Sequence, residues 1–548
     1  MKKRIPLLIV ISLIILHAVC NFIWLKNDDR PLQFDFGIYF DRSIDLFKSV
    51  KMGPKVFIQA LLGQGPYLNV YFHPSRIIVP LVSLPAYLFF GLHEDVAVMA
   101  LVVFFAILAL SVYGISKRII GPGAGVLAVF IVGTMPGIFW LSRHYSSEFV
   151  TTAIMALSVY LLIKSDYFSH KGYSALLGIS AGLGLLTKGI YFVFILGPLL
   201  SAFVTVLVVK ENIRPRMFNM IFSASLCVLV ASFWYVPYFN TITTRILNVP
   251  FSDEVRKLYN MPEILSVQNI LFYPVAVINW GASFFYSLLF ILGCFRFFHN
   301  LNAQSSVAFR QIKYTILMWI VVPYVFLTMV PSKSEEYFNL FYPVMAIVIT
   351  FAVFSVKRKL LRWGLMVLIV LVGGVQFFGM SYGTMDILPK QLAMNAAGVH
   401  ITIFKQGAPF LPQRTGWKMG EVLNYIYANR NDRPIDNKRY AICIMPDMGE
   451  LSVPVGKYHA NLHDLPFGFF GLNRAGYETT EKMLTTADFI VTKTGYQGLF
   501  LTEERRELAI NQIEQSGLFT KLPRDFSFPD GRLVNVYGRV PRGGNSGG

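Results

Sequence analysis

The sequence predicts a polytopic α-helical membrane protein with about eleven spans, interfacial helices in the first outer loop, and a C-terminal extracytoplasmic α/β domain. The first observation is composition: 54% of the 548 residues are hydrophobic and 15% are charged, whereas soluble domains carry roughly 25% charged residues. The mean hydropathy of +0.53 agrees with this. The second observation is a series of long apolar stretches, and the third is the placement of basic residues between them.

Each of the predicted spans is an apolar stretch that approaches or exceeds the length needed to cross a hydrocarbon core of about 30 Å. A further apolar segment, 77–92, is short and contains Pro80 and Pro85. Whether this segment crosses the membrane decides the sidedness of everything after it. The predicted spans lie near residues 5–25, 96–116, 122–141, 147–164, 173–187, 190–209, 217–236, 268–295, 313–330, 337–356 and 363–380.

The basic residues decide this question, because cytoplasmic loops carry an excess of Lys and Arg. If segment 77–92 lies in the interface, all the main basic groups fall on the cytoplasmic side, and the short outer loops are nearly bare of them. If it spans, the first group is separated from all the later ones. The interfacial interpretation is therefore favoured. The groups are Lys2-Lys3-Arg4, Lys117-Arg118, Lys164 with Lys171, Lys210 with Arg214 and Arg216, Arg296 with Arg310 and Lys313, and Lys357-Arg358-Lys359 with Arg362.

This topology places a cytoplasmic N-terminus, an outer loop at 26–95 and an outer domain at 381–548. The chain then divides into a transmembrane catalytic domain, 1–380, and a soluble α/β domain, 381–548. In the soluble domain we expect strands at 439–445, 488–492 and 534–540 and helices at 421–428 and 503–515. The net charge of +18 is explained by basic residues that set the orientation of the chain in the membrane and could attract anionic lipids. We therefore expect no nucleic-acid partner.

Isolated charged and aromatic residues gather at the predicted outer ends of the spans, and ionisable residues near membrane depth are candidates for function. One external pocket could collect them. The four cysteines show no metal-binding spacing, so no metal ligands are expected among them. The candidates are Asp35 and Asp41, His73 and Arg76 in the first loop, Arg143 and Glu148 after the third span, Lys188 after the fifth, and Lys333 and Tyr337 after the ninth.

Each candidate also has a structural explanation. Asp35 could cap a helix, and Arg143 with Glu148 could do the same. Lys188 could extend to the interface as lone lysines at span ends do. Lys333 could form a solvated salt bridge with the neighbouring acids, and His73 could be an interfacial histidine. The functional interpretation depends on the coincidence of an acid, several cations and a histidine at one face in four separate loops.

Several short motifs in fixed order make the chain resemble the GT-C glycosyltransferases, in the branch of protein O-mannosyltransferases and aminoarabinose lipid A transferases. The outer loop opens with an acid, and an interfacial segment introduced by proline follows. Two glycine-rich spans end in Leu186-Thr-Lys-Gly189, and a Lys-x-x-x-Tyr pair leads into Leu340-Phe-Tyr-Pro343. Near the end, Ala487-Asp-Phe-Ile-Val-Thr-Lys493 and Phe528-Pro-Asp-Gly531 are similar to the external domains of such enzymes.

The resemblance implies roles for individual residues. Asp35 would be the catalytic base, with Tyr39 on the same helix. Arg143 and Glu148 would be the charged pair before the fourth span, and Lys188 and Lys333 would lie near the donor phosphate. The chain departs from the family where Phe36 and Ile38 replace an acid and a base, and where His73-Pro-Ser75 replaces Lys-Pro-Pro.

The expected activity is transfer of a sugar from a polyprenyl-phosphate donor to a lipid, glycan or protein acceptor at the outer face, with inversion. A carboxylate can take the proton of the acceptor hydroxyl, and cations stabilise the charge that grows on the departing phosphate. No cofactor is required, although Asp35, Asp41 and Glu148 could hold a divalent cation. The expected location is a bacterial inner membrane, with the catalytic face and C-terminal domain periplasmic or extracellular. The alternative is a transporter or flippase of lipid-linked sugars.

Overall fold

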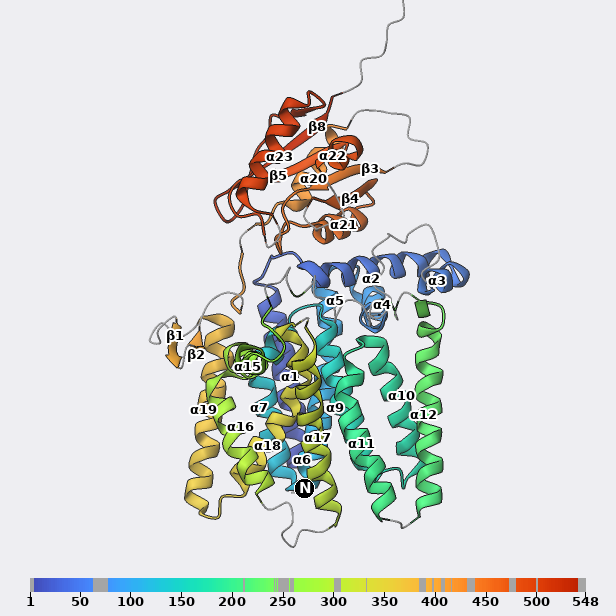
Figure 1. Ribbon diagram of the computed structural model, residues 1–548, viewed down its shortest axis with the longest axis vertical. Coiled ribbons are helices and arrows are strands. Elements are labelled where there is room, and N and C mark those ends of the chain that lie inside the picture. The colour runs from blue at the N-terminus through green and yellow to red at the C-terminus, as the bar shows by residue number, and fades with distance from the viewer. Residues whose placement is uncertain are drawn as a thin grey trace, which may run out of the picture.

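The computed structural model describes most of the chain, and Figure 1 shows a helical bundle with a sheet-containing region beyond one end. The described residues are 4–62, 77–209, 212–240, 261–299, 307–331, 333–383, 391–396, 399–405, 410–414, 416–430, 439–472, 480–498 and 501–540, together with Ile242, Thr244 and Arg256.

The bundle is built from helices that run alongside one another over much of their length (Figure 1). Their outer faces carry the large apolar side chains that a lipid environment accepts: Phe218, Val228 and Leu229 on α12 are each at least 60% exposed. The helices are α1 (Ile5–Leu25), α6 (Val102–Ile119), α7 (Pro122–Thr134), α9 (Ser147–Lys164), α10 (Lys171–Thr187), α11 (Tyr191–Val209), α12 (Ile213–Tyr235), α16 (Ser283–Phe298), α17 (Val307–Met329), α18 (Tyr342–Phe354) and α19 (Lys359–Tyr382).

Eight helical stretches within the described residues are long and apolar enough to cross a membrane. The other three predicted spans are shorter or interrupted, so the number of eleven stays a prediction. The span expected at 122–141 is divided at Met135, whose extended backbone separates α7 from α8 (Pro136–Leu141). That division follows from Pro136, which disfavours a helical conformation in the residue before it. The span expected at 173–187 corresponds to α10, which has 17 residues.

The span expected at 268–295 is not one continuous helix. It consists of α15 (Val267–Ala276), a π-helical turn η1 (Val277–Gly281) and α16. The interruption allows a close approach at Gly281: a Cβ there would lie 1.8 Å from the Tyr342 hydroxyl. Figure 1 shows α15 across the upper end of the bundle while α16 runs along it. Hydropathy alone could not reveal this bend, because both halves are equally apolar.

The first loop forms a layer of helices across one end of the bundle, as expected for interfacial helices (Figure 1). The helices predicted near 37–50 and 77–91 are present as α2 (Phe34–Met52) and α4 (Ile78–Phe90), with α3 (Pro54–Leu61) and α5 (Glu94–Ala100) in addition. Ser43 on α2 and Tyr87 on α4 share a hydrogen bond of 2.8 Å between their hydroxyls. Segment 77–92 therefore lies against α2 at the end of the bundle.

The C-terminal region contains a six-stranded mixed sheet of order β4-β3-β5-β8-β6, with β7 paired to β8. β3 (Tyr440–Ile444) is parallel to both β4 (Phe467–Gly471) and β5 (Phe489–Lys493). β8 (Leu533–Arg539) runs antiparallel to β5, β6 (Phe519–Lys521) and β7 (Phe526–Ser527). The helices are α20 (Met419–Ala428), α21 (Val453–Leu462), α22 (Thr480–Thr486) and α23 (Glu503–Gln515), and a separate hairpin joins β1 (Gln391–Ala396) and β2 (Val399–Lys405).

The sheet region contacts the first loop through α21, which packs along α2 (Figure 1). The buried ring of Tyr458 packs edge-on against Phe40, with ring centroids 5.4 Å apart. Its hydroxyl accepts a hydrogen bond of 3.1 Å from the Leu32 amide. Gly37 permits this contact, because a Cβ there would lie 3.2 Å from the tyrosine ring and 2.7 Å from the Leu32 carbonyl oxygen. α2 is thus enclosed between the bundle and the sheet region.

Candidate functional site

The first turn of α2 presents a carboxylate at the junction of bundle and sheet region. Gln33 precedes the helix in an extended conformation, so Asp35 occupies the first turn, where the helix dipole favours a negative charge. Asp35 is exposed, whereas Tyr39, one turn later, is 3% exposed. The Tyr39 hydroxyl donates to Asp35 Oδ2 at 3.4 Å. A buried phenol therefore supports an accessible acid.

The first turn of α9 carries a second carboxylate, which is buried. Ser146 caps the helix by accepting a hydrogen bond from the Phe149 amide, and Glu148 follows in the first turn. Glu148 forms an ion pair with Lys188, the residue after α10. Both side chains are buried, and the Ser146 and Ser147 hydroxyls donate to Glu148 Oε2 at 3.0 and 3.1 Å. Burial of a charge is tolerated because an opposite charge and hydrogen bonds satisfy it.

Ser147 joins these two carboxylate sites. Its hydroxyl lies 3.3 Å from the Tyr39 hydroxyl as well as 3.1 Å from Glu148, so its single proton can serve either acceptor. On the far side, the Lys188 amino group lies 5.2 Å from the centre of the Tyr337 ring, within cation–π range. We call the connected set the acid–lysine network; it comprises Asp35, Tyr39, Ser147, Glu148, Lys188 and Tyr337.

The network unites five of the residues singled out from the sequence, from four separate segments of the chain. Ser147 was missed, although it stands beside Glu148, because a serine in a helix's first turn usually serves only as a cap. Thr187 was missed for a similar reason. It accepts a hydrogen bond of 2.9 Å from Thr151, one turn after Ser147, and so fixes the end of α10 against α9. The repeated hydroxyls beside both charged residues were the available signal.

Arg143 lies apart from the acid–lysine network and does not pair with Glu148 in the structure. Its guanidinium donates to Asn21 Oδ1 at 3.0 Å and to the Ser381 hydroxyl at 2.7 Å. Four aromatic rings surround it at 5.1–5.9 Å, namely those of Trp24, Phe139, Phe377 and Tyr382. This arrangement joins α1, α8 and α19. A donor-binding role for Arg143 stays a prediction.

Lys333 is also held by groups other than those expected. Its amino group donates to the carbonyl oxygens of Leu327, Thr328 and Val330 at 2.8–3.2 Å. These carbonyls belong to the end of α17 and the residue after it, where carbonyl groups have no partner within the helix. Burial lowers the pKa of Lys333 to about 8. The solvated salt bridge to Glu335 and Glu336, which was the alternative explanation for Lys333, is not among the ion pairs of the described residues. A role at the phosphate stays a prediction.

Other predicted residues fall outside the network or outside the described part of the chain. His73 and Arg76 lie outside the described residues. Asp41, considered for a divalent cation with Asp35 and Glu148, accepts a hydrogen bond of 2.8 Å from Asn461 on α21. Among the described residues, no group of three or more His, Cys, Asp or Glu side chains is arranged to hold a metal ion.

Comparison with known proteins confirms the resemblance to GT-C glycosyltransferases. A family described as dolichyl-phosphate-mannose-protein mannosyltransferase matches residues 78–236. No curated protein matches the chain significantly.

Three solved structures illustrate the shared fold. ArnT from Cupriavidus metallidurans bound to undecaprenyl phosphate has 14% identity and a TM-score of 0.57, over 96% of this chain and 97% of that one. The oligosaccharyltransferase AglB from Archaeoglobus fulgidus, in complex with an inhibitory peptide and a dolichol-phosphate, has 11% identity and a TM-score of 0.52, over 98% and 75%. The arabinofuranosyltransferase AftD from Mycobacteria has 11% identity and a TM-score of 0.54, over 97% and 40%.

Proposed function

We propose that this integral membrane protein is a glycosyltransferase that moves a sugar from a polyprenyl-phosphate donor to a lipid, glycan or protein acceptor, with inversion. The observation that carries the proposal is the acid–lysine network. It presents one exposed carboxylate, Asp35, next to the buried ion pair of Glu148 and Lys188. The likeness to proteins solved with undecaprenyl phosphate and with dolichol-phosphate supports the class of donor.

In the proposed reaction, the acceptor oxygen attacks the anomeric carbon while the bond from that carbon to the phosphate oxygen breaks. Asp35 takes the proton of the acceptor hydroxyl, and the Tyr39 hydroxyl holds the carboxylate in position. The bonding electron pair leaves with the phosphate. Lys188 supplies positive charge on that side, and Glu148 holds Lys188 in place. A single displacement of this kind inverts the anomeric centre.

The remaining predicted residues complete the proposal. Tyr337 would lie at the donor side of Lys188, and His73 and Arg76 would approach from the first loop. Arg143 would fix the segment that leads into α9, and Lys333 the segment that leads to Tyr337. We propose that residues 1–380 form the catalytic domain and 381–548 the outer domain. The proposed location is a bacterial inner membrane with the site at the periplasmic face.

The test uses the purified protein in detergent with a radiolabelled polyprenyl-phosphate pentose or hexose and a lipid extract as acceptor. We expect release of polyprenyl phosphate and labelling of the acceptor, with both lost in Asp35→Asn. A transporter would instead move the labelled lipid between the leaflets of reconstituted vesicles and release no polyprenyl phosphate. That result would overturn the proposal.

The sidedness has its own test, which uses exposed positions at the two ends of the bundle. Cysteines introduced as Lys55→Cys on α3 and Glu507→Cys on α23 should both react with an impermeant thiol reagent from outside the cell. Lys357→Cys, at the opposite end, should react only after permeabilisation. Reaction of Lys357→Cys in intact cells, or of only one of the first two, would contradict the proposed topology.

A further inference from the structure

A pocket of about 540 Å³ lies between α6 and α9 at the end of the bundle away from the acid–lysine network. The distance is large because Glu148 and Lys164 occupy opposite ends of α9. The sixteen positions between them, at a rise of about 1.5 Å each, correspond to ~24 Å. The pocket therefore belongs to neither the proposed donor site nor the acceptor site. Its lining comes from α6 and α9 and includes three cations, Lys117, Arg118 and Lys164.

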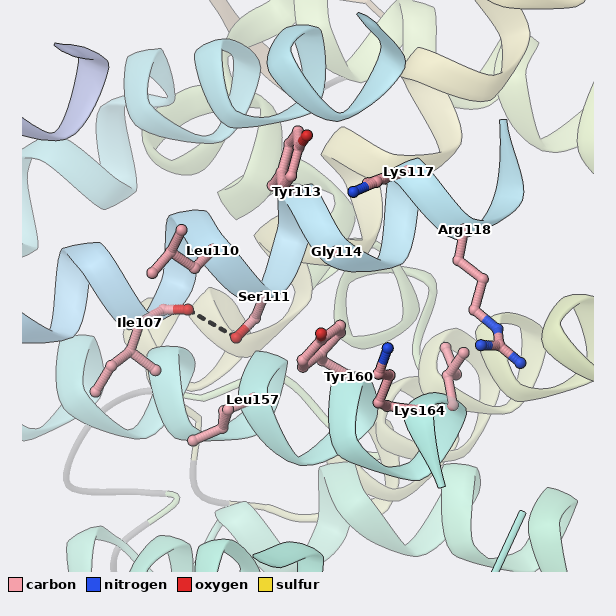
Figure 2. A pocket seen from close by; sticks show the side chains of 11 residues that line it. Ile107, Leu110, Ser111, Tyr113, Gly114, Lys117, Arg118, Leu157, Tyr160 and Lys164 are labelled. Atoms are coloured by element: carbon pink, nitrogen blue, oxygen red, sulfur yellow. Dashed lines mark hydrogen bonds between the residues drawn. The ribbon is translucent and has the colours of Figure 1, made fainter. Parts of the chain in front are cut away.

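The lining changes character along the helices. Figure 2 shows Ile107, Leu110 and Leu157 toward one end, and Lys117, Arg118 and Lys164 toward the other. The apolar and basic ends are separated along α6 by the eleven positions from Ile107 to Arg118, or about 16 Å. A hydrocarbon core is about 30 Å thick, so this length is close to the depth of one leaflet.

The basic end offers positive charge that acids do not neutralise. No lining residue is acidic, and within the described part of the chain none of the three cations forms an ion pair. The Lys117 amino group instead lies 5.6 Å from the centre of the Tyr113 ring, and that of Lys164 lies 5.6 Å from the Tyr173 ring. An ammonium group over a ring still has N–H donors for an anion. The nearby Asp166 is paired with Arg216.

The shape of the pocket depends on Gly114. A Cβ at this position would lie 2.3 Å from Cε2 of Tyr160, so the absence of a side chain lets the tyrosine ring lie against α6 between the apolar and basic ends. The Ser111 hydroxyl donates a hydrogen bond of 2.7 Å to the Ile107 carbonyl oxygen. It therefore offers no proton to a ligand at the apolar end. Leu110 is 44% exposed, so this end is open to the surroundings of the bundle.

We propose that this pocket binds one anionic phospholipid of the cytoplasmic leaflet, with its phosphate at Lys117, Arg118 and Lys164 and an acyl chain along Ile107, Leu110 and Leu157. The proposal rests on charge complementarity and on the matched length of the two ends. Basic pockets between membrane helices on the cytoplasmic side are suited to acidic headgroups, because that leaflet is rich in anionic lipids. The bound lipid would hold α6 and α9 together from the end opposite the network.

The test measures binding of phosphatidylglycerol and of phosphatidylcholine to the full chain in detergent by native mass spectrometry. The first variant carries Lys117→Gln, Arg118→Gln and Lys164→Gln together. Its matched control carries Lys357→Gln, Arg358→Gln and Lys359→Gln, which removes the same charge from exposed positions at the same end. We expect one tightly bound phosphatidylglycerol in the wild type and the control, and binding weaker by on the order of 100-fold in the first variant.

A second variant, Leu110→Trp, keeps every charge and fills the apolar end. This variant should also lose the bound lipid. If the lipid were attracted only by the overall charge of the protein, Leu110→Trp would bind it as tightly as the wild type does. Equal binding of both lipids, or equal losses in the first variant and its control, would overturn the proposal. Displacement of the lipid by inorganic phosphate at the same concentration would also overturn it, because the ligand would then be the free anion.

Discussion

The two sides of α2 hold polar side chains in different ways. On the bundle side, Tyr39 reaches through Ser147 to the oppositely charged pair Glu148 and Lys188. On the sheet-region side, Asp41 and Asp45 share one amide, since Asn461 Nδ2 donates to a carboxylate oxygen of each at 2.8 Å. The first arrangement contains matched charges, and the second brings like charges together.

This difference distinguishes the candidate functional site, on the bundle side of α2, from the junction between α2 and the sheet region. A buried acid that pairs with a lysine and accepts two serine hydrogen bonds can position an accessible acid through Ser147 and Tyr39. Two carboxylates around one amide cannot both be charged at low cost. Burial, and then the neighbouring charge of Asp41, raise the pKa of Asp45 to about 8, and burial also raises the pKa of Asp41. One side of α2 is therefore suited to chemistry, and the other to docking that depends on protonation.

The largest expected effect compares two acids on the same helix. Asp35→Asn keeps the size of the side chain and its hydrogen bond to Tyr39 but removes the proton acceptor, so turnover should fall by ~10²–10⁴. The Asp41 side chain faces α21 and not the acid–lysine network, so Asp41→Asn should keep most of the activity. Initial rates with a labelled polyprenyl-phosphate sugar measure both. An active Asp35→Asn with an inactive Asp41→Asn would mean that the catalytic side of α2 is the sheet-region side.

The next effect concerns the buried pair. Lys188→Gln removes the cation that pairs with the buried Glu148, which should cost ~3–5 kcal/mol of stability and lower kcat/KM by roughly tenfold or more. The double variant Glu148→Gln with Lys188→Gln should be less destabilised than the sum of the single variants. Thermal unfolding and steady-state kinetics report the two quantities.

The matched control is Lys48→Gln on the other side of α2. Lys48 pairs at 2.6 Å with Asp464, whose side chain is 82% exposed, and also donates to the carbonyl and side-chain oxygens of Asn461. Its loss should therefore cost ~1–2 kcal/mol, less than the loss of Lys188. Equal costs for Lys188→Gln and Lys48→Gln would contradict the contrast between the two sides.

The third effect is a pH dependence confined to the junction. The pKa of Asp45 is raised from 3.8 to about 8 in the folded protein, so the folded chain binds more protons between these values. The contribution of Asp45 to stability must then decrease as the pH rises from about 4 to about 8. The melting temperature of the wild type should therefore fall relative to that of Asp45→Asn across this range. At pH 8 the variant should be the more stable. A steeper fall in the variant would show that Asp45 docks as an ion.

The sequence predicted the parts of this contrast that depend on residue type and topology. A carboxylate in the first turn of α2 and charged residues at one end of several spans were sufficient to name Asp35, Glu148 and Lys188. The partners could not be predicted, because they depend on side chains that meet only after folding. Arg143 meets Asn21 and Ser381 from helices more than 100 positions away. Asn461 meets Asp41 only because α21 docks on α2.

The fold, like the site, could be predicted only where residue type alone indicates the structure. The strands expected at 439–445, 488–492 and 534–540 are present as β3, β5 and β8, because their apolar runs are bounded by turn residues. β4, with the sequence Phe-Gly-Phe-Phe-Gly, gave no alternating signal. α15 and α16 were read as one helix, because apolar composition does not reveal a π-helical turn.

The smallest effect compares two buried lysines near the network. Lys188 has a carboxylate partner, whereas Lys333 gives its three N–H donors to three backbone carbonyls, which is the full donor capacity of an ammonium group. Lys333→Gln should therefore lower the melting temperature while kcat/KM changes by less than about threefold, since one to two ordinary hydrogen bonds of ~1 kcal/mol are lost.

The pKa of Lys333 is lowered from 10.5 to about 8, so the unfolded chain binds more protons between these values. The stability of the wild type relative to Lys333→Gln should accordingly increase as the pH rises from about 8 to 10. A tenfold loss of kcat/KM without any change in stability would instead show that Lys333 leaves the end of α17 and turns to the donor phosphate.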